Sequence, residues 1–180
     1  MPFNSPDIET FKGDLGNNIS AVLKLKADSH ANIKIQSLLN ITIYVSATRF
    51  LEGSVKHVIY NCCKMRGDNA GQLGMLESEL KKFNNPEFVN IKAEVQRHLG
   101  FDISNGLQTA KFTPRDISFL DEIVRNRHRN VHATHDPADW YSKNIKDIIN
   151  DFNKEYTGLL NILAYLDSIA FDGGTGLFRD

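Results

Sequence analysis

The chain has 180 residues, of which 41% are hydrophobic and 24% charged, and its formal net charge is −1. These values are typical of a single globular domain, so they exclude the disordered, collagen-like and fibrous classes. The balance of acidic and basic residues argues against a uniformly basic surface, so any contact with nucleic acid must come from a local patch. No apolar run reaches the roughly 18 residues that a membrane-spanning helix needs.

Proline positions predict where several helices begin. Ser5-Pro6, Asn85-Pro86, Thr113-Pro114 and Asp136-Pro137 each join a favourable N-cap residue to a proline at the first helical position. The cap side chain accepts a backbone N–H there, and the N–H that proline lacks would have had no helical partner. Four helix starts of this kind favour an all-α chain.

Apolar spacing predicts the helices themselves. The residues around 38–62 include the β-branched run 41–45, which could be a strand by propensity alone. The segment nevertheless keeps a three-then-four apolar spacing along its whole length, which is typical of a helix and too long for a strand. The other helices are expected around residues 5–27, 71–83 and 86–99, after Thr113-Pro114, and over 141–170.

The last of these helices is expected to end at Gly173-Gly174, so that residues 171–180 form a glycine-rich tail. The fold class predicted for the whole chain is all-α, an antiparallel bundle of about five or six helices in which residues 1–170 form one domain.

The neighbours Cys62 and Cys63 are the only cysteines. Because adjacent cysteines form a disulfide only with strain, we expect two reduced thiols and a cytoplasmic protein.

The residues that point to chemistry gather between Arg125 and Asp136. This stretch holds three arginines and three of the six histidines, at the C-terminal end of the helix that follows Thr113-Pro114. Cations complement the negative end of a helix, which is the simplest interpretation of the cluster. Arg127, however, is in phase with the apolar positions of that helix. We therefore expect a carboxylate, a phosphate or a partner chain to receive its guanidinium.

His132 follows Arg127 by five residues, about 7.5 Å along the helix axis and about 140° around it. The side chains of Arg127 and His132 can contact one phosphate if the length of the arginine or a loosened last turn compensates for that angle. The pattern Arg127-x4-His132 resembles the Arg-x(4–6)-His motif of the HEPN superfamily, small helical domains that carry it near the end of a helix. His128 stands where the family often has Asn, and Val131 stands where the residue before the His is often small.

A second stretch carries the same resemblance. Residues 50–56, Phe-Leu-Glu-Gly-Ser-Val-Lys, are similar to a Glu-Gly stretch in the second major helix of the HEPN branch related to RiboL-PSP domains. The resemblance covers residues 30–170. Arg125-Asn126, with six residues before His132, also satisfies the motif, and its helical phase matches His132 better. We favour Arg127, which lies on the apolar side, and the choice between the two arginines stays open.

The resemblance implies a metal-independent endoribonuclease without cofactors, in which two protomers pair so that their motifs line one cleft. RNA supplies its own nucleophile, the 2′-OH, so His132 can act as general base or acid and Arg127 can bind the phosphate oxygens. The expected product is a 2′,3′-cyclic phosphate. The partners that the resemblance implies are RNA, a second copy of the chain and an antitoxin or other regulatory protein, in a toxin–antitoxin or defence setting. The residues expected to support RNA binding are Arg125, Asn126, His128, Arg129, Asn130 and Glu52.

Two alternatives remain open at this point. In the first, the domain is a non-catalytic dimerisation or RNA-binding module that acts with a partner protein, and Arg127 is an interface residue. In the second, His128 and His132 bind Zn²⁺ one helical turn apart, with His135 or Asp136 as a third ligand. Three flanking arginines would repel a dication, so we expect no metal site.

Glu52 lies on the apolar stripe of its helix, where an unpaired carboxylate would be costly. It is expected either to reach water at the edge of the stripe or to be held at a cleft or dimer contact. The isolated histidines His30, His57 and His98 are expected to be structural or solvent-facing.

Overall fold

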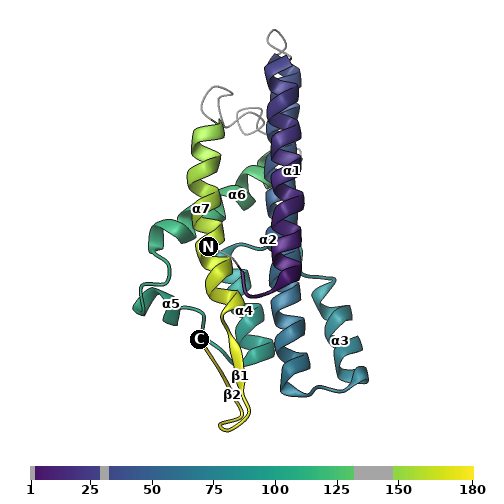
Figure 1. The fold of residues 1–180 in the computed structure, drawn as a ribbon, viewed down its shortest axis with the longest axis vertical. Coiled ribbons are helices and arrows are strands. Elements are labelled where there is room, and N and C mark those ends of the chain that lie inside the picture. The colour runs from purple at the N-terminus through teal and green to yellow at the C-terminus, as the bar shows by residue number, and fades with distance from the viewer. Residues whose placement is uncertain (1–2, 29–32, 132–147) are drawn as a thin grey trace.

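The computed structural model describes residues 3–28, 33–131 and 148–180. In these ranges the chain forms a helical bundle with one small β-hairpin (Figure 1), so the predicted all-α bundle is confirmed. None of the described helices is both long and apolar enough to cross a membrane. The elements are α1 (Pro6–Asp28), α2 (Ile33–Arg66), α3 (Ala70–Leu80), α4 (Phe88–Leu99), α5 (Asn105–Gln108), α6 (Pro114–Val131), α7 (Ile148–Asp167), β1 (Ala170–Asp172) and β2 (Leu177–Arg179).

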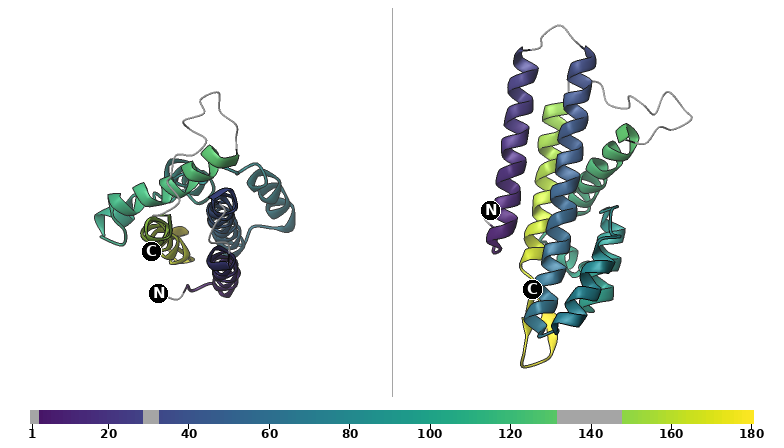
Figure 2. Two further views of the ribbon diagram at one scale, coloured as in Figure 1. Left: turned by 90° about the horizontal axis from the view of Figure 1, so that it is seen from above. Right: turned by 90° about the vertical axis from the view of Figure 1, so that its right-hand side faces the viewer.

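Helix α2 is the centre of the bundle. Helices α1 and α7 run beside it with similar axis directions (Figures 1 and 2), and α3, α4 and α6 also contact it. Helix α6 packs most extensively against α7. Helix α6, whose C-terminal end carries the arginine and histidine cluster of the sequence, is therefore packed against helices on two sides.

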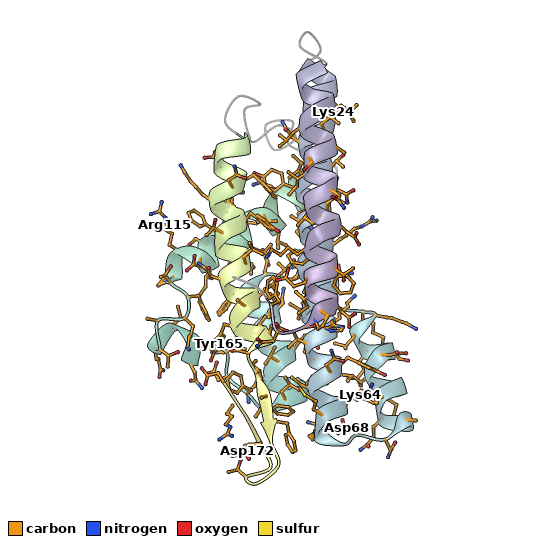
Figure 3. All side chains as sticks on the ribbon, viewed as in Figure 1. Lys24, Lys64, Asp68, Arg115, Tyr165 and Asp172 are labelled. Carbon is orange, nitrogen blue, oxygen red and sulfur yellow. The ribbon has the colours of Figure 1, made fainter. Side chains whose placement is uncertain are left out.

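The buried residues of α2 explain why its β-branched run is helical. Ile43, Tyr44, Ala47, Leu51 and Val55 are all nearly inaccessible to solvent. Burying each large apolar side chain contributes roughly 1.5–3 kcal/mol, which outweighs the modest helix penalty of β-branched residues. Side chains of the surrounding helices converge on α2 to form this interior (Figure 3).

Two of the predicted proline starts agree with the structure. Helix α1 begins at Pro6, directly after Ser5, and α6 begins at Pro114. At α6, the Thr113 N–H donates to the Asp116 carboxylate across 2.8 Å, and the Asp116 N–H donates to Thr113 Oγ1 across 3.2 Å. This reciprocal pair is a capping box, which stabilises the first turn. Asp136-Pro137 lies outside the described residues.

The predicted start at Asn85-Pro86 is wrong by two residues. Helix α4 begins at Phe88, and the Phe88 N–H donates to Asp121 Oδ1 of α6 across 2.8 Å. Asn85 does not cap the helix, because its side-chain oxygen lies 3.1 Å from His128 Nε2. A carboxylate from another helix thus replaces the local cap.

The predicted tail forms a hairpin. Helix α7 ends at Asp167, and strands β1 and β2 pair antiparallel with Phe171 opposite Phe178. These two rings lie 5.2 Å apart between centroids, and the Arg66 guanidinium of α2 lies 5.8 Å from the Phe178 ring. The turn is stabilised by the Gly174 N–H, which donates to Asp172 Oδ1. Aromatic contacts therefore hold this segment at the end of α2.

Helices α6 and α7 approach closely at Gly158. A Cβ at this position would lie 2.8 Å from the Phe119 Cβ and 2.9 Å from the Asp116 main chain. One turn further along α7, the Asn161 amide donates to Asp116 Oδ1 across 3.2 Å. Only glycine, which has no side chain, allows α6 and α7 to approach this closely. This close approach sets the position of α6 in the bundle.

Candidate functional site

The structure describes only part of the predicted catalytic cluster. The side chains of Arg125, Asn126, Arg127 and His128 lie in the last turns of α6. Arg129 and Asn130 belong to the helical backbone of α6, but their side chains are outside the described residues. His132, the expected general acid or base, is also outside them. The predicted pairing of Arg127 with His132 therefore stays a prediction.

Arg127 is half-buried and bonds to the loop between α3 and α4. Its Nη1 donates to the main-chain carbonyl of Asn84 across 2.9 Å. Among the described residues it forms no ion pair, so a carbonyl stands where the sequence analysis expected a carboxylate, a phosphate or a partner. A guanidinium carries five N–H donors and stays charged at all physiological pH values. Arg127 can consequently hold the loop and still bind an anion.

His128 joins the same loop to α6. Its Nε2 lies 3.1 Å from Asn85 Oδ1, so the ring N–H donates to the amide oxygen. Earlier on α6, Asp121 accepts the Phe88 N–H, as described above. Burial raises the pKa of Asp121, and the Phe88 N–H opposes this rise. Three α6 side chains thus fix residues 84–88 in place.

Asn126 is the most deeply buried described member of the cluster, with 1% of its surface exposed. Its Nδ2 donates to Glu122 Oε1 across 3.4 Å, one turn earlier on the helix. Arg125 is exposed and pairs with Glu122 at 3.7 Å. The apolar phase indicated that Arg127 lies inward of Arg125, which agrees with their exposures. The apolar phase did not predict the burial of Asn126. Helix α6 packs against both α2 and α7, so more than one of its faces is buried.

Glu52 forms an ion pair on its own helix. The Lys56 ammonium donates to Glu52 Oε1 across 2.5 Å, and a quarter of each side chain is exposed. This partner satisfies the carboxylate, which agrees with the interpretation that Glu52 lies at the edge of the stripe. A Cβ added at the neighbouring Gly53 would meet no atom within 4 Å. The Glu-Gly stretch is therefore not required for close packing within this chain.

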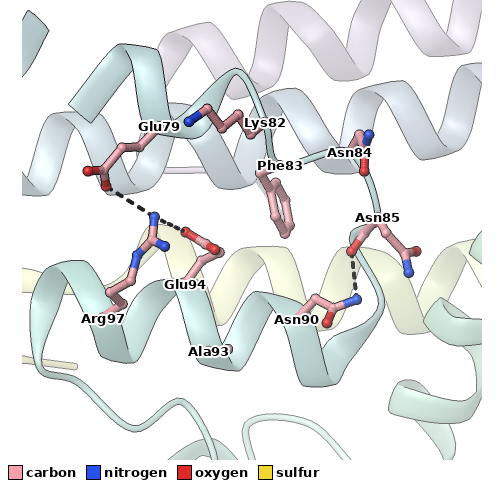
Figure 4. Close-up of a pocket in the computed structure, with 9 residues that line it drawn as sticks. All are labelled: Glu79, Lys82, Phe83, Asn84, Asn85, Asn90, Ala93, Glu94 and Arg97. Carbon is pink, nitrogen blue, oxygen red and sulfur yellow. Dashed lines mark hydrogen bonds and ion pairs between the residues drawn. The ribbon is translucent and has the colours of Figure 1, made fainter. Parts of the chain in front are cut away.

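Beside Asn84 and Asn85 is a groove between α3 and α4, which we call the α3–α4 groove (Figure 4). Its volume is about 450 Å³. At one end, Arg97 Nη2 lies 3.1 Å from Glu79 Oε2 and 3.2 Å from Glu94 Oε2. At the other end, Asn90 Nδ2 donates to the Asn85 carbonyl across 3.0 Å. The lining residues are Glu79, Lys82, Phe83, Asn84, Asn85, Asn90, Ala93, Glu94 and Arg97.

Sequence reasoning did not find this groove. Its residues come from two helices and their connecting loop, and none of them forms a motif by itself. The only available signal in this segment was Asn85-Pro86, which was interpreted as a helix start. The groove adjoins the predicted site because Arg127 and His128 bond to the same two asparagines.

A larger pocket, of about 690 Å³, lies where the start of α1, the later turns of α2 and the end of α7 meet. There His57 Nε2 lies 2.9 Å from Ser5 Oγ, 2.7 Å from Asn61 Nδ2 and 3.4 Å from Asp7 Oδ2. A catalytic triad needs the carboxylate on the other ring nitrogen, which orients the imidazole. Here all three partners meet one nitrogen, so His57 joins α1 to α2 as a structural histidine.

The histidine metal site of the sequence analysis falls largely outside the described residues. Of its four expected ligands only His128 is described, and that ring bonds to Asn85. Among the described residues, no three His, Cys, Asp or Glu side chains gather as a metal-binding group would. No protein-family model, curated protein or solved structure matches the chain.

Proposed function

We propose that this protein is a metal-independent endoribonuclease of the HEPN type, in which Arg127 and His132 act on one RNA phosphodiester. The observation that carries the proposal is the state of Arg127. It is a half-buried guanidinium on a helix that is packed on two sides, bonded to one main-chain carbonyl and to no carboxylate of the described residues. Such a preoriented cation with spare donors suits a phosphate.

The reaction needs little from the protein. The RNA 2′-OH attacks the adjacent phosphorus, and the O5′ of the next nucleotide leaves. This produces a 2′,3′-cyclic phosphate and a 5′-OH end. His132 would remove the 2′-OH proton or deliver one to O5′. Arg127 would donate two N–H bonds to the non-bridging oxygens, where negative charge develops in the transition state. Arg125 and Arg129 would add a local positive field for the backbone.

A second copy of the chain completes this proposal. One histidine cannot be both the base and the acid of the same step, so a homodimer with two Arg127–His132 pairs in one cleft would supply both. The proposed setting is the cytoplasm, in a toxin–antitoxin or defence system, where an antitoxin-type partner would keep the site silent.

One observation favours a second candidate, a non-catalytic RNA-binding or dimerisation module that acts with a partner protein. Arg127 and His128 both bond to the loop between α3 and α4, which is a structural role that requires no reaction. In this alternative the arginines bind RNA or a partner chain, and no phosphodiester is cleaved.

The test is cleavage of end-labelled structured RNA by the purified protein in excess EDTA. We expect products with 2′,3′-cyclic phosphate ends, and a loss of at least about a hundredfold in rate in both Arg127→Ala and His132→Ala, as when one transition-state donor is removed. Arg115→Ala is the matched control, since Arg115 lies in the first turn of the same helix (Figure 3). Its guanidinium lies 5.2 Å from the centroid of the Phe119 ring. Arg127→Lys keeps the charge but not the paired donors, so it should remain impaired.

Other outcomes distinguish the alternatives. Cleavage that requires added Zn²⁺ or Mn²⁺ would support a metal site built on His128, His132 and His135. Failure to cleave under any condition, together with intact RNA binding, would support the binding module.

A further inference from the structure

We propose that the α3–α4 groove binds one unstacked nucleobase of single-stranded RNA, next to the phosphate that Arg127 receives. This inference rests on the proposed ribonuclease function and adds to it a base-recognition site. The first argument is continuity. The Asn84 carbonyl and the Asn85 amide oxygen accept bonds from Arg127 and His128, and the same two asparagines line the groove. A nucleotide bound in the groove would therefore lie beside the arginine.

The second argument is size and shape. The volume of about 450 Å³ falls in the range of small-ligand pockets, about 300–1,000 Å³. Along α4, the short side chain of Ala93 lies between Asn90 and Glu94, and the ring of Phe83 projects from the loop toward this middle part of the groove (Figure 4). A flat ring system fits such a slot between two helices.

The third argument is hydrogen-bonding chemistry at one end of the groove. Asn90 Nδ2 uses one hydrogen for the Asn85 carbonyl. Its second hydrogen and its Oδ1 have no partner among the described residues. An amide presents a donor beside an acceptor, which is the pattern that pairs with the edge of a base. Sequence-specific recognition of RNA uses unstacked bases in this way.

The fourth argument is the orientation of the Arg97 guanidinium at the other end of the groove. Its guanidinium is held by Glu79 and Glu94, which fixes the orientation of its plane. Bases stack on guanidinium planes as they do on aromatic rings. One guanidinium beside two carboxylates leaves this end of the groove with a net charge of −1, so it suits a neutral base better than a second phosphate. Lys82 at the rim forms no ion pair among the described residues, so it is available for the phosphate of the bound nucleotide.

The test measures binding separately from cleavage. The probes are four fluorescent 2′-O-methyl RNA octamers that differ in one central base, and they cannot be cleaved because their 2′-OH groups are blocked. Dissociation constants are measured by fluorescence anisotropy at several salt concentrations. We expect the parent protein to prefer one base by about tenfold, which corresponds to about 1.4 kcal/mol.

Each variant should change a different quantity. Asn90→Ala should remove the base preference. Arg97→Lys should weaken binding of all four probes by about tenfold, within the range measured for the loss of one stacking partner. Lys82→Ala should weaken all four equally and reduce the salt slope by roughly 0.7. Asn17→Ala and Lys24→Ala are the matched controls, because both residues are exposed on α1.

The outcomes separate the two proposals. Equal base preference in the parent and in Asn90→Ala, or no binding of any probe, would overturn the base site even if cleavage were intact. A base preference that Asn90→Ala removes, in a protein that never cleaves RNA, would overturn the ribonuclease and leave the base site standing. If Asn90→Ala does not fold, 4-thiouridine cross-linking to the parent decides: cross-links within residues 79–97 support the site, and cross-links elsewhere overturn it.

Discussion

Arg127 of α6 and Asn84 of the loop between α3 and α4 are joined by a hydrogen bond of 2.9 Å, from the guanidinium Nη1 to the main-chain carbonyl. A carbonyl carries no charge, so it orients the arginine without neutralising it. A carboxylate in the same place would have cancelled the positive charge. This relationship lets one residue serve the fold and keep its charge for an anion.

The solvent exposures of Arg125 and Arg127 predict which of the two arginines contributes to RNA cleavage. Arg127→Ala should reduce the rate of RNA cleavage in EDTA by at least about a hundredfold. Arg125 is exposed and paired with Glu122, so Arg125→Ala should lower it less than about tenfold, as expected for a screened surface charge. Single-turnover cleavage rates measure both. The opposite ranking would identify Arg125 as the motif arginine.

Alanine substitutions at two helical glycines should have different effects on the free energy of unfolding. In Gly158→Ala the new methyl would collide with Phe119 and the Asp116 main chain, so the free energy of unfolding should fall by roughly 1–3 kcal/mol. Gly53→Ala meets no neighbouring atom, so it should leave stability unchanged or raise it by about 0.5–1 kcal/mol. Urea denaturation of both variants tests this pair. Equal stability of the two would contradict the close approach of α6 and α7.

Stability should fall in alkaline solution because of Tyr44. Its hydroxyl donates to the buried Glu155 carboxylate across 3.0 Å. Burial, and then the charge of Glu155, raise the pKa of Tyr44 well above its usual value. Above about pH 10, where tyrosine ionises in an unfolded chain, the unfolded state binds fewer protons than the folded state. The free energy of unfolding therefore decreases as pH rises.

The variant that tests this is Tyr44→Phe. It should lower stability near pH 7 by roughly 1–3 kcal/mol, because the buried carboxylate loses a donor. It should also reduce the dependence of stability on pH between about 9 and 11, because one group with a raised pKa is gone. Chemical denaturation across this pH range measures both effects. An unchanged pH dependence would show that Tyr44 is not the group responsible.

The two thiols should be free but unreactive in the folded protein. Cys62 and Cys63 form no disulfide and are buried. Burial raises the pKa of Cys62 to about 12, with smaller contributions from Cys63 and Asp167. Burial also raises the pKa of Cys63, but the nearby Arg66 opposes the rise. At pH 8 an aromatic disulfide reagent should therefore react slowly with both thiols, and with Cys63 first.

Single substitutions show which of the two thiols reacts at which rate. Cys62→Ser should leave only the faster reaction, and Cys63→Ser only the slower one, while in denaturant both thiols should react at once. Two thiols that react in the folded protein as fast as in denaturant would contradict their burial.

The sequence by itself determined the fold class and the local signals. The cap formed by Thr113 and Asp116 and the starts of α1 and α6 follow from residues within one or two turns of each other. The helical state of the β-branched run in α2 follows from the apolar spacing along that whole helix. The order of Arg125 and Arg127 in exposure followed from helical phase. These features are predictable because their hydrogen bonds and apolar periods are set by short sequence spacings.

The tertiary structure alone decided the rest. The cap of α4 comes from Asp121, 33 residues away, and it displaced the local cap expected from Asn85. The hairpin is held by Arg66 and Phe178, and the α3–α4 groove combines residues of two helices with their loop. Such partners meet only when helices pack, because packing depends on the shapes of several faces at once. No single stretch of sequence encodes those shapes, so the acceptor of Arg127 could not be predicted from it.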